Sequence, residues 1–447
     1  MKKFFFAAIT LILLSACAKS DTEQGTPDIT PEISSPAVSE TIISIDELKQ
    51  GSGYLLLDLR ESTLFNGFMQ EGFDRGGHLK GAINFPYSTL KDLNGQGIDL
   101  LEYLKGMGVT PDKKIVIYSN DNGKSFDLSR KLIDLGFEDV KFFEGLADWA
   151  NDTSLELIKY PNYQAIVNPT WINKLINDEK PESYNNSDYI VLEACTDENA
   201  SLYEEGHIPG AISFNLNNIE SEATAFGLNP YDAIIETLLE YGVTADKTVV
   251  VYSRDDSSAA RLVFTLLWAG VKDARFLDGG YAAWEQSIYD KDTTINGNVP
   301  ETNFGGGGAP KEGLIIGAGD IATNLQDPTF KLLSIRGQGE YSASVVEPLI
   351  SRPGEISGAI WGYDTAGYLN PNGTLKSFGE VKEMWSDIGI EEGDRLCFSS
   401  TFSDQACLPW FIAYVGGWGN ISLFDGGYYS WQLDSSRPVQ TGQPAGQ

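Results

Sequence analysis

A pattern that recurs three times restricts the fold of this 447-residue chain more than any other sequence feature. The copies of its most similar segment are MGVTPDKKIVIYS at 107–119, YGVTADKTVVVYS at 241–253 and, more loosely, IGIEEGDRLCFSS at 388–400. Each copy follows an apolar opening run and precedes a turn that ends on tryptophan, at Trp149, Trp284 and Trp431. A repeat of about 130 residues indicates three copies of one structural unit in tandem.

Strand-like and helix-like segments alternate inside each unit. In the first unit the apolar runs LLLDL, IVIYS and VKFF are separated by the amphipathic stretches DLLEYLKGMG and LSRKLIDLG. Such alternation is typical of parallel strands that are connected by helices crossing over the sheet. We therefore predict an α/β fold in which a mainly parallel sheet with helices on both faces occurs three times.

Composition shifts divide the chain further. GGGGAP at 305–310 separates the second unit from the third, and the segment around 151–168 separates the first from the second. The predicted division is a signal peptide at 1–16, a flexible tether at 17–40, domains at 41–160, 161–300 and 313–437, a Gly-rich linker at 301–312 and a tail at 438–447.

The first residues are typical of export rather than of a folded domain. MKKFFFAAITLILLSAC has a basic start, an apolar run too short to span a bilayer, and a Leu-Ser-Ala-Cys ending that resembles a bacterial lipoprotein signal. The resemblance implies that Cys17 is lipidated and that a membrane is one partner of the chain. Ala18 in place of aspartate favours the outer membrane of a Gram-negative bacterium and leaves the membrane face open.

The net charge excludes some partners. The formal charge is −31, and such a surface repels nucleic acid, so we predict no nucleic-acid partner. The same field disfavours anionic ligands unless a local cation compensates. The chain contains no spacing typical of a zinc site or of a dinucleotide-binding loop, and we predict neither a metal nor a cofactor.

Short motifs occur in the same order in the units. Asp58 and Arg60 form a D-x-R motif, GHLKGA and GHIPGA contain His78 and His207, and LDGG precedes the last tryptophan of the second unit. Together with the strand that leads into a loop and a helix, this order resembles the rhodanese family from about residue 41 to 436. The resemblance implies three tandem rhodanese-like domains, each with a five-stranded sheet, and structural roles for these two histidines and the D-x-R pair.

In active rhodaneses the residue after the central strand is a cysteine, whose thiolate carries sulfur as a persulfide. The resemblance places Ser119 and Ser253 at this position in the first two units. In the third unit a gap-free alignment places Ser400 there, and a slip of one residue places Ser399 there. A serine hydroxyl is hardly ionised near neutral pH and cannot carry sulfane sulfur, so we predict that all three nucleophile positions are degenerate.

The loops that follow these serines carry the wrong charge for a bound anion. Asp121, Asp255, Asp256 and Asp404 stand beside amides that the family uses to hold an anion. Each carboxylate would oppose an anion a few ångströms away by about 1–4 kcal/mol. The remaining candidates for anion binding in these loops are Gly123, Lys124 and Arg254.

Three cysteines besides Cys17 are alternative thiols. Cys195 stands where the first unit has Arg60, Cys397 lies on the strand before Ser400, and Cys407 lies on the helix that follows. We interpret them as packed side chains, and we leave open a Cys397–Cys407 disulfide or redox pair and a relocated persulfide site. The two histidines belong to structural motifs, which argues against a serine hydrolase because no general base is left for the serines.

These observations favour a lipid-anchored binding or interaction scaffold in envelope sulfur or redox physiology. Its partner would be an unknown envelope protein or a small sulfur-containing ligand, and clefts between units that are lined by Trp and Tyr are the expected surfaces. The alternative is a thiosulfate-type sulfurtransferase, or a protein that handles other chalcogen oxyanions, with a non-standard cysteine as nucleophile. A third hypothesis is a purely structural envelope lipoprotein.

Overall fold

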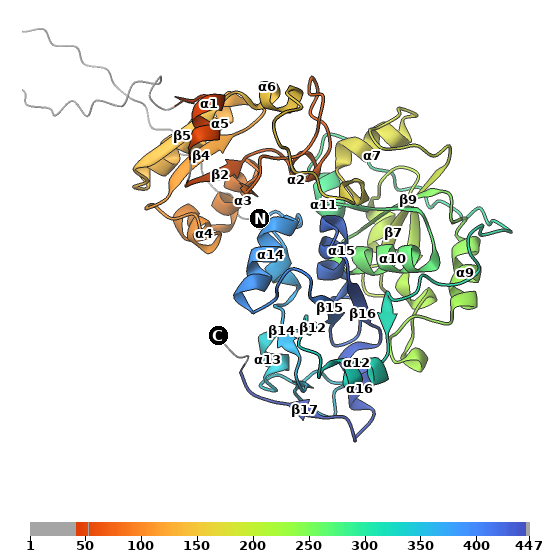
Figure 1. Ribbon diagram of the computed structural model, residues 1–447. Helices are drawn as coiled ribbons and strands as arrows, with labels where there is room; N and C mark the ends of the chain where they lie inside the picture. Colours follow the sequence, from red (N-terminus) through yellow and green to blue (C-terminus); the bar gives the residue numbers. More distant parts are fainter. Residues whose placement is uncertain (1–41, 52, 444–447) are drawn as a thin grey trace, which may run out of the picture. The chain divides into compact units, whose positions relative to one another are not determined.

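The computed structural model describes residues 42–51 and 53–443 (Figure 1). The predicted signal peptide, the predicted tether and the lipidation site Cys17 lie outside the described residues, and so do residues 444–447 of the predicted tail. No helix within the described residues is both long and apolar enough to cross a membrane.

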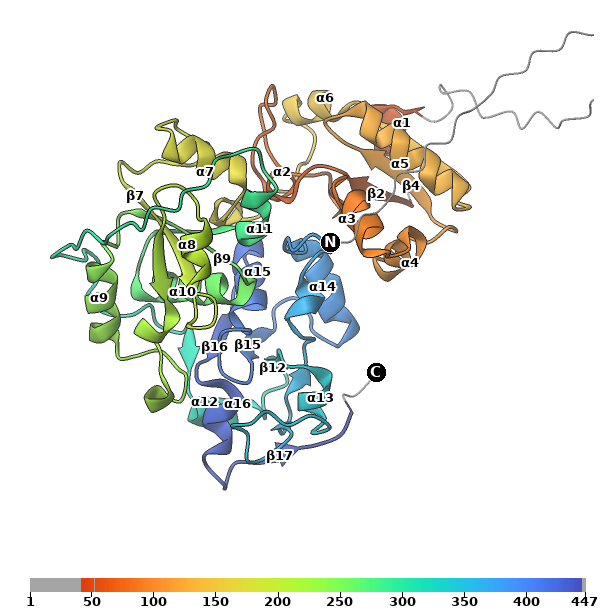
Figure 2. The ribbon, with the colours of Figure 1, turned by 180° about the vertical axis from the view of Figure 1, so that it is seen from behind.

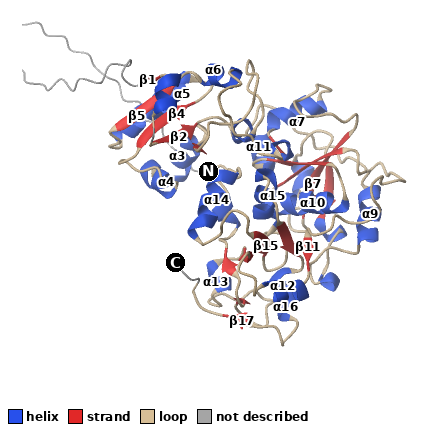
Figure 3. Cartoon of the chain, viewed as in Figure 1, coloured by secondary structure: helices blue, strands red, loops and turns tan. Residues whose placement is uncertain are grey.

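Three five-stranded sheets follow one another along the chain, drawn red in Figure 3. The first contains β1 (Ile42–Ile43), β2 (Tyr54–Asp58), β3 (Ala82–Asn84), β4 (Lys114–Tyr118) and β5 (Asp139–Phe143). The second contains β6 (Ile166–Val167), β7 (Tyr189–Cys195), β8 (Ile212–Asn215), β9 (Thr248–Ser253) and β10 (Asp273–Leu277). The third contains β11 (Ile315–Ile316), β12 (Phe330–Ser334), β14 (Ile360–Trp361), β15 (Arg395–Ser399) and β16 (Ile421–Phe424).

The spatial order of the strands is the same in the three sheets. The orders are β1-β5-β4-β2-β3, β6-β10-β9-β7-β8 and β11-β16-β15-β12-β14. All strand pairs in these sheets are parallel, while β13 (Glu355–Ile356) and β17 (Val439–Gln440) form a separate antiparallel pair. The predicted α/β fold with mainly parallel five-stranded sheets is confirmed, and β4, β9 and β15 are the central strands.

Helices connect the strands and flank the sheets (Figures 1 and 2). The first sheet is accompanied by α1 (Ile45–Gln50), α2 (Ser62–Asn66), α3 (Thr89–Gln96), α4 (Leu100–Gly106), α5 (Asn122–Asp134) and α6 (Leu146–Asn151). The second is accompanied by α7 (Pro169–Ile176), α8 (Leu202–Glu205), α9 (Tyr231–Glu240), α10 (Asp256–Ala269) and α11 (Gly280–Glu285). The third is accompanied by α12 (Ala318–Asn324), α13 (Gln338–Tyr341), α14 (Phe378–Asp387), α15 (Cys407–Gly416) and α16 (Gly427–Gln432).

Burial explains why the central strands read as continuous apolar runs. Every residue of β9, TVVVYS, is buried, and four of the five residues of β4 are buried. A parallel sheet is covered by helices on both faces, so both sets of alternating side chains need an apolar environment. The β-branched valines of β9 suit this position because they fit the pleated surface of a strand.

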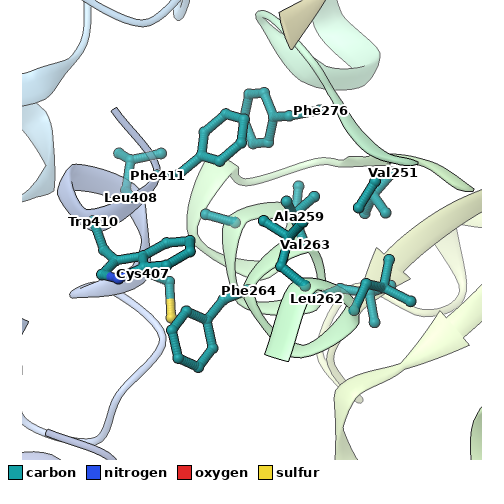
Figure 4. Close-up of a cluster of buried hydrophobic side chains, with 14 of the residues drawn as sticks. Val251, Ala259, Leu262, Val263, Phe264, Phe276, Cys407, Leu408, Trp410 and Phe411 are labelled. Carbon is teal, nitrogen blue, oxygen red and sulfur yellow. The ribbon is translucent and has the colours of Figure 1, made fainter. Parts of the chain in front are cut away.

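The second and third sheets share one hydrophobic core, which forms where α10 and α15 pack together. The residues of α10 from Ser258 to Ala269 are all buried, as expected for a helix that is covered on all sides. Figure 4 shows this contact: the rings of Phe264 and Trp410 meet edge to face, with centroids 4.7 Å apart. Truncation of a buried aromatic residue such as Trp410 to alanine costs about 3–5 kcal/mol, so the helix pair is a major stabilising contact.

The predicted Gly-rich linker at 301–312 makes backbone contacts with the second unit. The N–H of Ala245 donates to the carbonyl of Phe304 at 2.7 Å, and the N–H of Lys311 donates to the carbonyl of Trp268 at 2.8 Å. The predicted domain boundaries remain predictions, but these hydrogen bonds show that the segment lies against α10 rather than away from it.

Candidate functional site

The three predicted nucleophile positions follow the carboxyl ends of the central strands, the edge at which parallel α/β sheets bind ligands. In the sheet registers, Asp58 pairs with Tyr118, Glu193 with Tyr252 and Ser334 with Ser399. The residue that follows Tyr118, Tyr252 or Ser399 therefore has the same position in each unit. These equivalent residues are Ser119, Ser253 and Ser400. The glycines that begin α11 and α16 give the same alignment. A β-carbon added at Gly280 would meet the carbonyl of Ser253, and one added at Gly427 would meet the carbonyl of Ser400, so Ser400 rather than Ser399 is equivalent to Ser253.

In the first unit, the loop after β4 satisfies its own polar groups. Ser119 is buried, and its Oγ accepts a hydrogen bond from the N–H of Asp121 at 3.0 Å. The carboxylate of Asp121 then caps α5 by accepting from the N–H of Gly123 at 2.9 Å. Lys124 lies over the ring of Tyr87, with Nζ 5.6 Å from the ring centroid. The amide of Gly123, a predicted anion-binding group, is thus used by a carboxylate of the same loop.

The loop of the second unit is closed in the same way. Ser253 donates its hydroxyl to the carbonyl of Asp255. The carboxylate of Asp255 caps α10 by accepting from the N–H of Ser258 at 2.8 Å, and it also accepts from the side chain of Asn199 at 3.3 Å. Burial raises the pKa of Asp256 to about 7, and the charge of Asp255 acts in the same direction. A second negative charge is therefore disfavoured at the start of this helix.

The loop of the third unit lacks a capping carboxylate but contains a half-buried acid, Asp404. Ser400 is fully buried, and its Oγ accepts from the N–H of Ala406 at 3.3 Å. The carbonyl of Ser400 accepts from the N–H of Tyr428 at 2.8 Å. Burial raises the pKa of Asp404, the main cause being desolvation of its carboxylate. The charge of Arg261 acts in the opposite direction and favours the Asp404 carboxylate.

The histidines lie in structural positions that do not activate the serines. The Nδ1 atom of His78 is 2.8 Å from the carbonyl oxygen of Phe65, and its ring stacks on Phe65 with centroids 3.7 Å apart. His207 repeats this arrangement with Tyr203, at 2.8 Å and 3.8 Å. Burial lowers the pKa of His78 to about 4, so its ring is neutral at pH 7. No hydrogen bond within residues 42–51 and 53–443 joins either histidine to a loop serine.

The three alternative thiols are buried and unpaired. Cys195, Cys397 and Cys407 are free, so the disulfide that the sequence left open is not formed. Burial raises the pKa of Cys397 and of Cys407 to about 12, and it also raises the pKa of Cys195, near the carboxylates of Glu193 and Asp197. A thiol with a raised pKa is mostly protonated at neutral pH and is a poor nucleophile.

Each loop lies beside an arginine, which is buried in the first and third units and partly buried in the second. Arg60 binds the carboxylate of Asp58 at 2.5 Å and the carbonyl of Gly77 at 2.8 Å. In the second unit, where Cys195 replaces this arginine, Arg254 from the loop binds Glu193 at 2.9 Å. Its Nη2 also donates to the carbonyl of Gly206, which precedes His207 as Gly77 precedes His78. Arg254 was predicted as an anion-binding residue, and these contacts commit its guanidinium to a structural ion pair instead.

The third unit keeps the arginine but moves the carboxylate. Arg336 donates to the carbonyl of Gly354 at 2.6 Å and binds Glu355 at 3.2 Å. Glu355 occupies the position of the histidines, and Ser334 occupies the position of Asp58 and donates its hydroxyl to Glu355 at 2.6 Å. Sequence reasoning missed Arg336 because the aspartate of the D-x-R motif is a serine here; the S-x-R spacing at residues 334–336 was the available signal.

The described ranges, 42–51 and 53–443, contain no group of three or more His, Cys, Asp or Glu side chains that could hold a metal ion. The candidate site comprises three serine loops, each with hydrogen bonds of its own and each next to an arginine–carboxylate ion pair. Among the described residues, the first loop has a cation at its side, Lys124, whose ammonium lies over the ring of Tyr87.

Comparisons with known proteins agree with the fold. The rhodanese-like domain, as a family, matches residues 44–152 and 168–287, about half of the chain. Thiosulfate sulfurtransferase YnjE of Escherichia coli is 28% identical over 410 residues, covering 90% of this chain and 92% of the relative. A putative thiosulfate sulfurtransferase of Haloferax volcanii is 25% identical over 285 residues, covering 62% of this chain and 96% of the relative.

Solved structures match over nearly the same length. The anaerobic ergothioneine biosynthesis enzyme from Chlorobium limicola, in complex with its natural substrate trimethyl histidine, has a TM-score of 0.84 and 26% identity, covering 90% of this chain and 100% of that one. The structure of EanB with ergothioneine and a cysteine persulfide has a TM-score of 0.83 and 26% identity, with the same coverage. The persulfide in that protein is carried by cysteine, whereas this chain has serine after each central strand.

Proposed function

The chain belongs to the rhodanese-like domain family, and from this premise we propose that it is a non-catalytic member that acts as a binding scaffold. In this proposal it has three tandem rhodanese-like domains, is exported and lipid-anchored through Cys17, and serves sulfur or redox physiology in the envelope. The single observation that carries the proposal is the serine at all three nucleophile positions, in loops whose hydroxyls and amides are already hydrogen-bonded.

The third sheet supports three tandem domains although the family match ends at residue 287. Its strand order equals that of the first two sheets, and Arg336 repeats the buried ion pair beside the loop. Glu355 replaces the histidine of the other units, which keeps a carboxylate next to this arginine after Ser334 replaced the aspartate. The third unit therefore has the same fold and the same kind of buried ion pair as the first, although a different carboxylate forms the pair.

Thiosulfate:cyanide turnover by the purified protein tests the loss of catalysis. We expect turnover at the background rate of free thiols, because the thiols are buried and the loops hold serine. The matched variants are Cys195→Ser, Cys397→Ser and Cys407→Ser, measured one at a time. Turnover well above background that disappears in one of these variants would overturn the proposal and identify the nucleophile.

The alternative, a sulfurtransferase with a relocated nucleophile, rests on Cys407. Its Sγ is 4.0 Å from Nη1 of Arg261, the closest approach of a cysteine to a cation among the side-chain hydrogen bonds of the described residues. Burial nevertheless raises the pKa of this thiol to about 12. Intact-mass spectrometry after incubation with thiosulfate distinguishes the two readings, since a gain of one sulfur atom mapped to Cys407 supports the alternative.

The scaffold's ligand and anchoring need separate tests. Calorimetric titration with thiosulfate and with ergothioneine, which the names of the relatives mention, tests for a small sulfur ligand. Pull-down from envelope fractions, repeated with an Arg336→Ala variant that alters the third loop, tests for a protein partner. For anchoring, the Cys17→Ala variant is expected to lose metabolic labelling by fatty acid and to leave the membrane fraction; unchanged labelling would rule out lipidation at Cys17.

A further inference from the structure

A cavity of about 660 Å³ lies at the amino-terminal edge of the third sheet. Its lining includes the first residues of three strands: Phe330 of β12, Arg395 of β15 and Ile421 of β16. Ser400 follows the opposite end of β15, and a strand of five residues spans about 16 Å. The cavity is therefore separate from the serine loops, and its volume falls within the range of about 300–1,000 Å³ that is usual for small-molecule sites.

Aromatic rings form much of the cavity wall. Trp410 and Tyr414 of α15 line it and stack on each other, with ring planes 5° apart and centroids 5.6 Å apart. Trp418, just beyond the end of α15, and Phe330 complete the aromatic lining. Tyr414 and Trp418 are half-buried, so parts of their rings remain accessible. Rings of this kind favour a planar ligand, because a flat apolar surface can stack on them or meet their edges.

Two cationic side chains, Lys311 and Arg395, belong to the lining of the cavity. Lys311 lines the cavity, and its ammonium makes no ion pair within residues 42–51 and 53–443. Arg395 is held by hydrogen bonds from Nη2 to Asn324 at 3.1 Å and Asp327 at 2.7 Å, which leaves Nε and Nη1 for another acceptor. The indole N–H of Trp410, in the cavity wall, is buried without a partner in the described residues; in Figure 4 it lies on the side of the ring away from Phe264.

Negative groups near the cavity are mostly satisfied. The carboxylate of Asp327 forms an ion pair with Arg395. Among the residues that line the cavity, the acidic one is Glu312, whose side chain is exposed. The carboxyl end of α15 would also disfavour an anion. Its carbonyls are occupied, however, because Asn162 donates its side-chain amide to Tyr414 at 2.7 Å and its backbone N–H to Val415 at 3.1 Å.

We propose that this cavity is a binding site for planar aromatic carboxylates. The rings of Tyr414 and Trp418 would contact the aromatic part, and Lys311 and Arg395 would bind the carboxylate. This assignment does not depend on the serine loops and goes beyond the proposed scaffold function, since it names a second surface with its own ligand chemistry. It also gives a role to Lys311, which has no ion-pair partner within the described residues of a protein of net charge −31.

Calorimetric titration of the purified protein with 2-naphthoate tests the site. We expect saturable binding of one equivalent, with binding of the uncharged analogue 2-naphthylmethanol weaker by about tenfold or more, because a hydrogen bond to a charged group contributes about 1.5–3 kcal/mol. Acetate, which has the charge without the ring, should bind weakly as well. Equal affinity for the charged and uncharged naphthalenes, or no saturable binding of 2-naphthoate, would overturn the proposal.

Two matched lysine variants locate the binding. Lys311→Gln is expected to weaken 2-naphthoate binding by about tenfold. Lys272→Gln, which removes an exposed lysine paired with Asp246, should leave the affinity unchanged. Lys124→Gln tests the first serine loop, and a loss of affinity in that variant instead of in Lys311→Gln would assign the ligand to the loop and refute the cavity. All three lysines are half-buried or exposed, so the folded state can be verified by unchanged thermal melting.

Discussion

Replacement of Arg261 by methionine tests how the second and third units are held together. Arg261 lies on α10 and is fully buried. Its Nε binds Glu220 at 2.8 Å within the second unit, and its Nη2 binds Asp425 at 2.8 Å in the third unit. Methionine fills a similar volume without charge, so the variant removes the cation and leaves both carboxylates in the interface.

The expected loss follows from this geometry. Removal of one partner from a buried ion pair costs about 3–5 kcal/mol, because the remaining charge is uncompensated. Two carboxylates lose their partner here, but both keep some access to solvent, with side chains 17% and 12% exposed. We therefore expect a loss of about 4 kcal/mol in the free energy of unfolding at pH 7, or about a thousandfold in the equilibrium constant.

Urea denaturation monitored by tryptophan fluorescence measures this loss, since Trp268 and Trp410 lie in the shared core. The triple variant Arg261→Met, Glu220→Gln, Asp425→Asn is the matched control and should regain much of the stability, because it removes the buried charges as well. Burial already raises the pKa of Glu220, and loss of the Arg261 charge removes the main effect that lowers it, so the stability of the single variant should increase as the pH falls from 8 to 5. A midpoint in urea close to that of the wild type would refute the reasoning.

Three further outcomes are expected. Arg254→Ala should lower the free energy of unfolding by about 3 kcal/mol, because it leaves the buried carboxylate of Glu193 without its cation. A second change, Cys195→Arg, should restore part of this loss by supplying a cation from the position that Arg60 holds in the first unit. Urea denaturation that shows no such restoration would contradict the equivalence of the two arginines. Cys397 and Cys407 should react with Ellman's reagent at pH 7 only in urea, because burial raises their pKa to about 12, and rapid reaction of the folded protein would contradict this. Burial raises the pKa of Asp278 to about 7, above its unfolded value, so its contribution to stability is lost as the pH rises from about 4 towards 7. Over this pH range the melting temperature of the Asp278→Asn variant should therefore fall less than that of the wild type. Parallel curves of melting temperature against pH would refute the assignment.

Much of the fold was predictable because it depends on local pattern. Apolar runs such as the one in β9 indicate buried parallel strands, and three similar segments indicate three similar sheets. The serine that ends or follows each central strand was also located to within one residue. The choice between Ser399 and Ser400 needed the pairing of β15 with β12, because a strand register is set by hydrogen bonds to a distant segment.

The role of charged residues was less predictable. Arg254 follows β9 in a loop and was predicted to meet an anion, yet it binds Glu193, 61 residues away in the chain. Arg336 carries no complete motif and was missed, although the same ion pair recurs in its unit. Charge partners are chosen by proximity in the folded state, and sequence spacing reveals this only when both partners belong to one motif.

The sequence by itself determined the repeated α/β architecture and the presence of a serine at or after the end of each central strand. Both follow from residue identity and short-range periodicity, which act along the chain. Only the tertiary structure decided that the loop amides are already hydrogen-bonded, that the remaining thiols are buried, and that Arg261 joins two units. These properties depend on desolvation and on contacts between segments far apart in sequence, and such contacts exist only after the chain has folded.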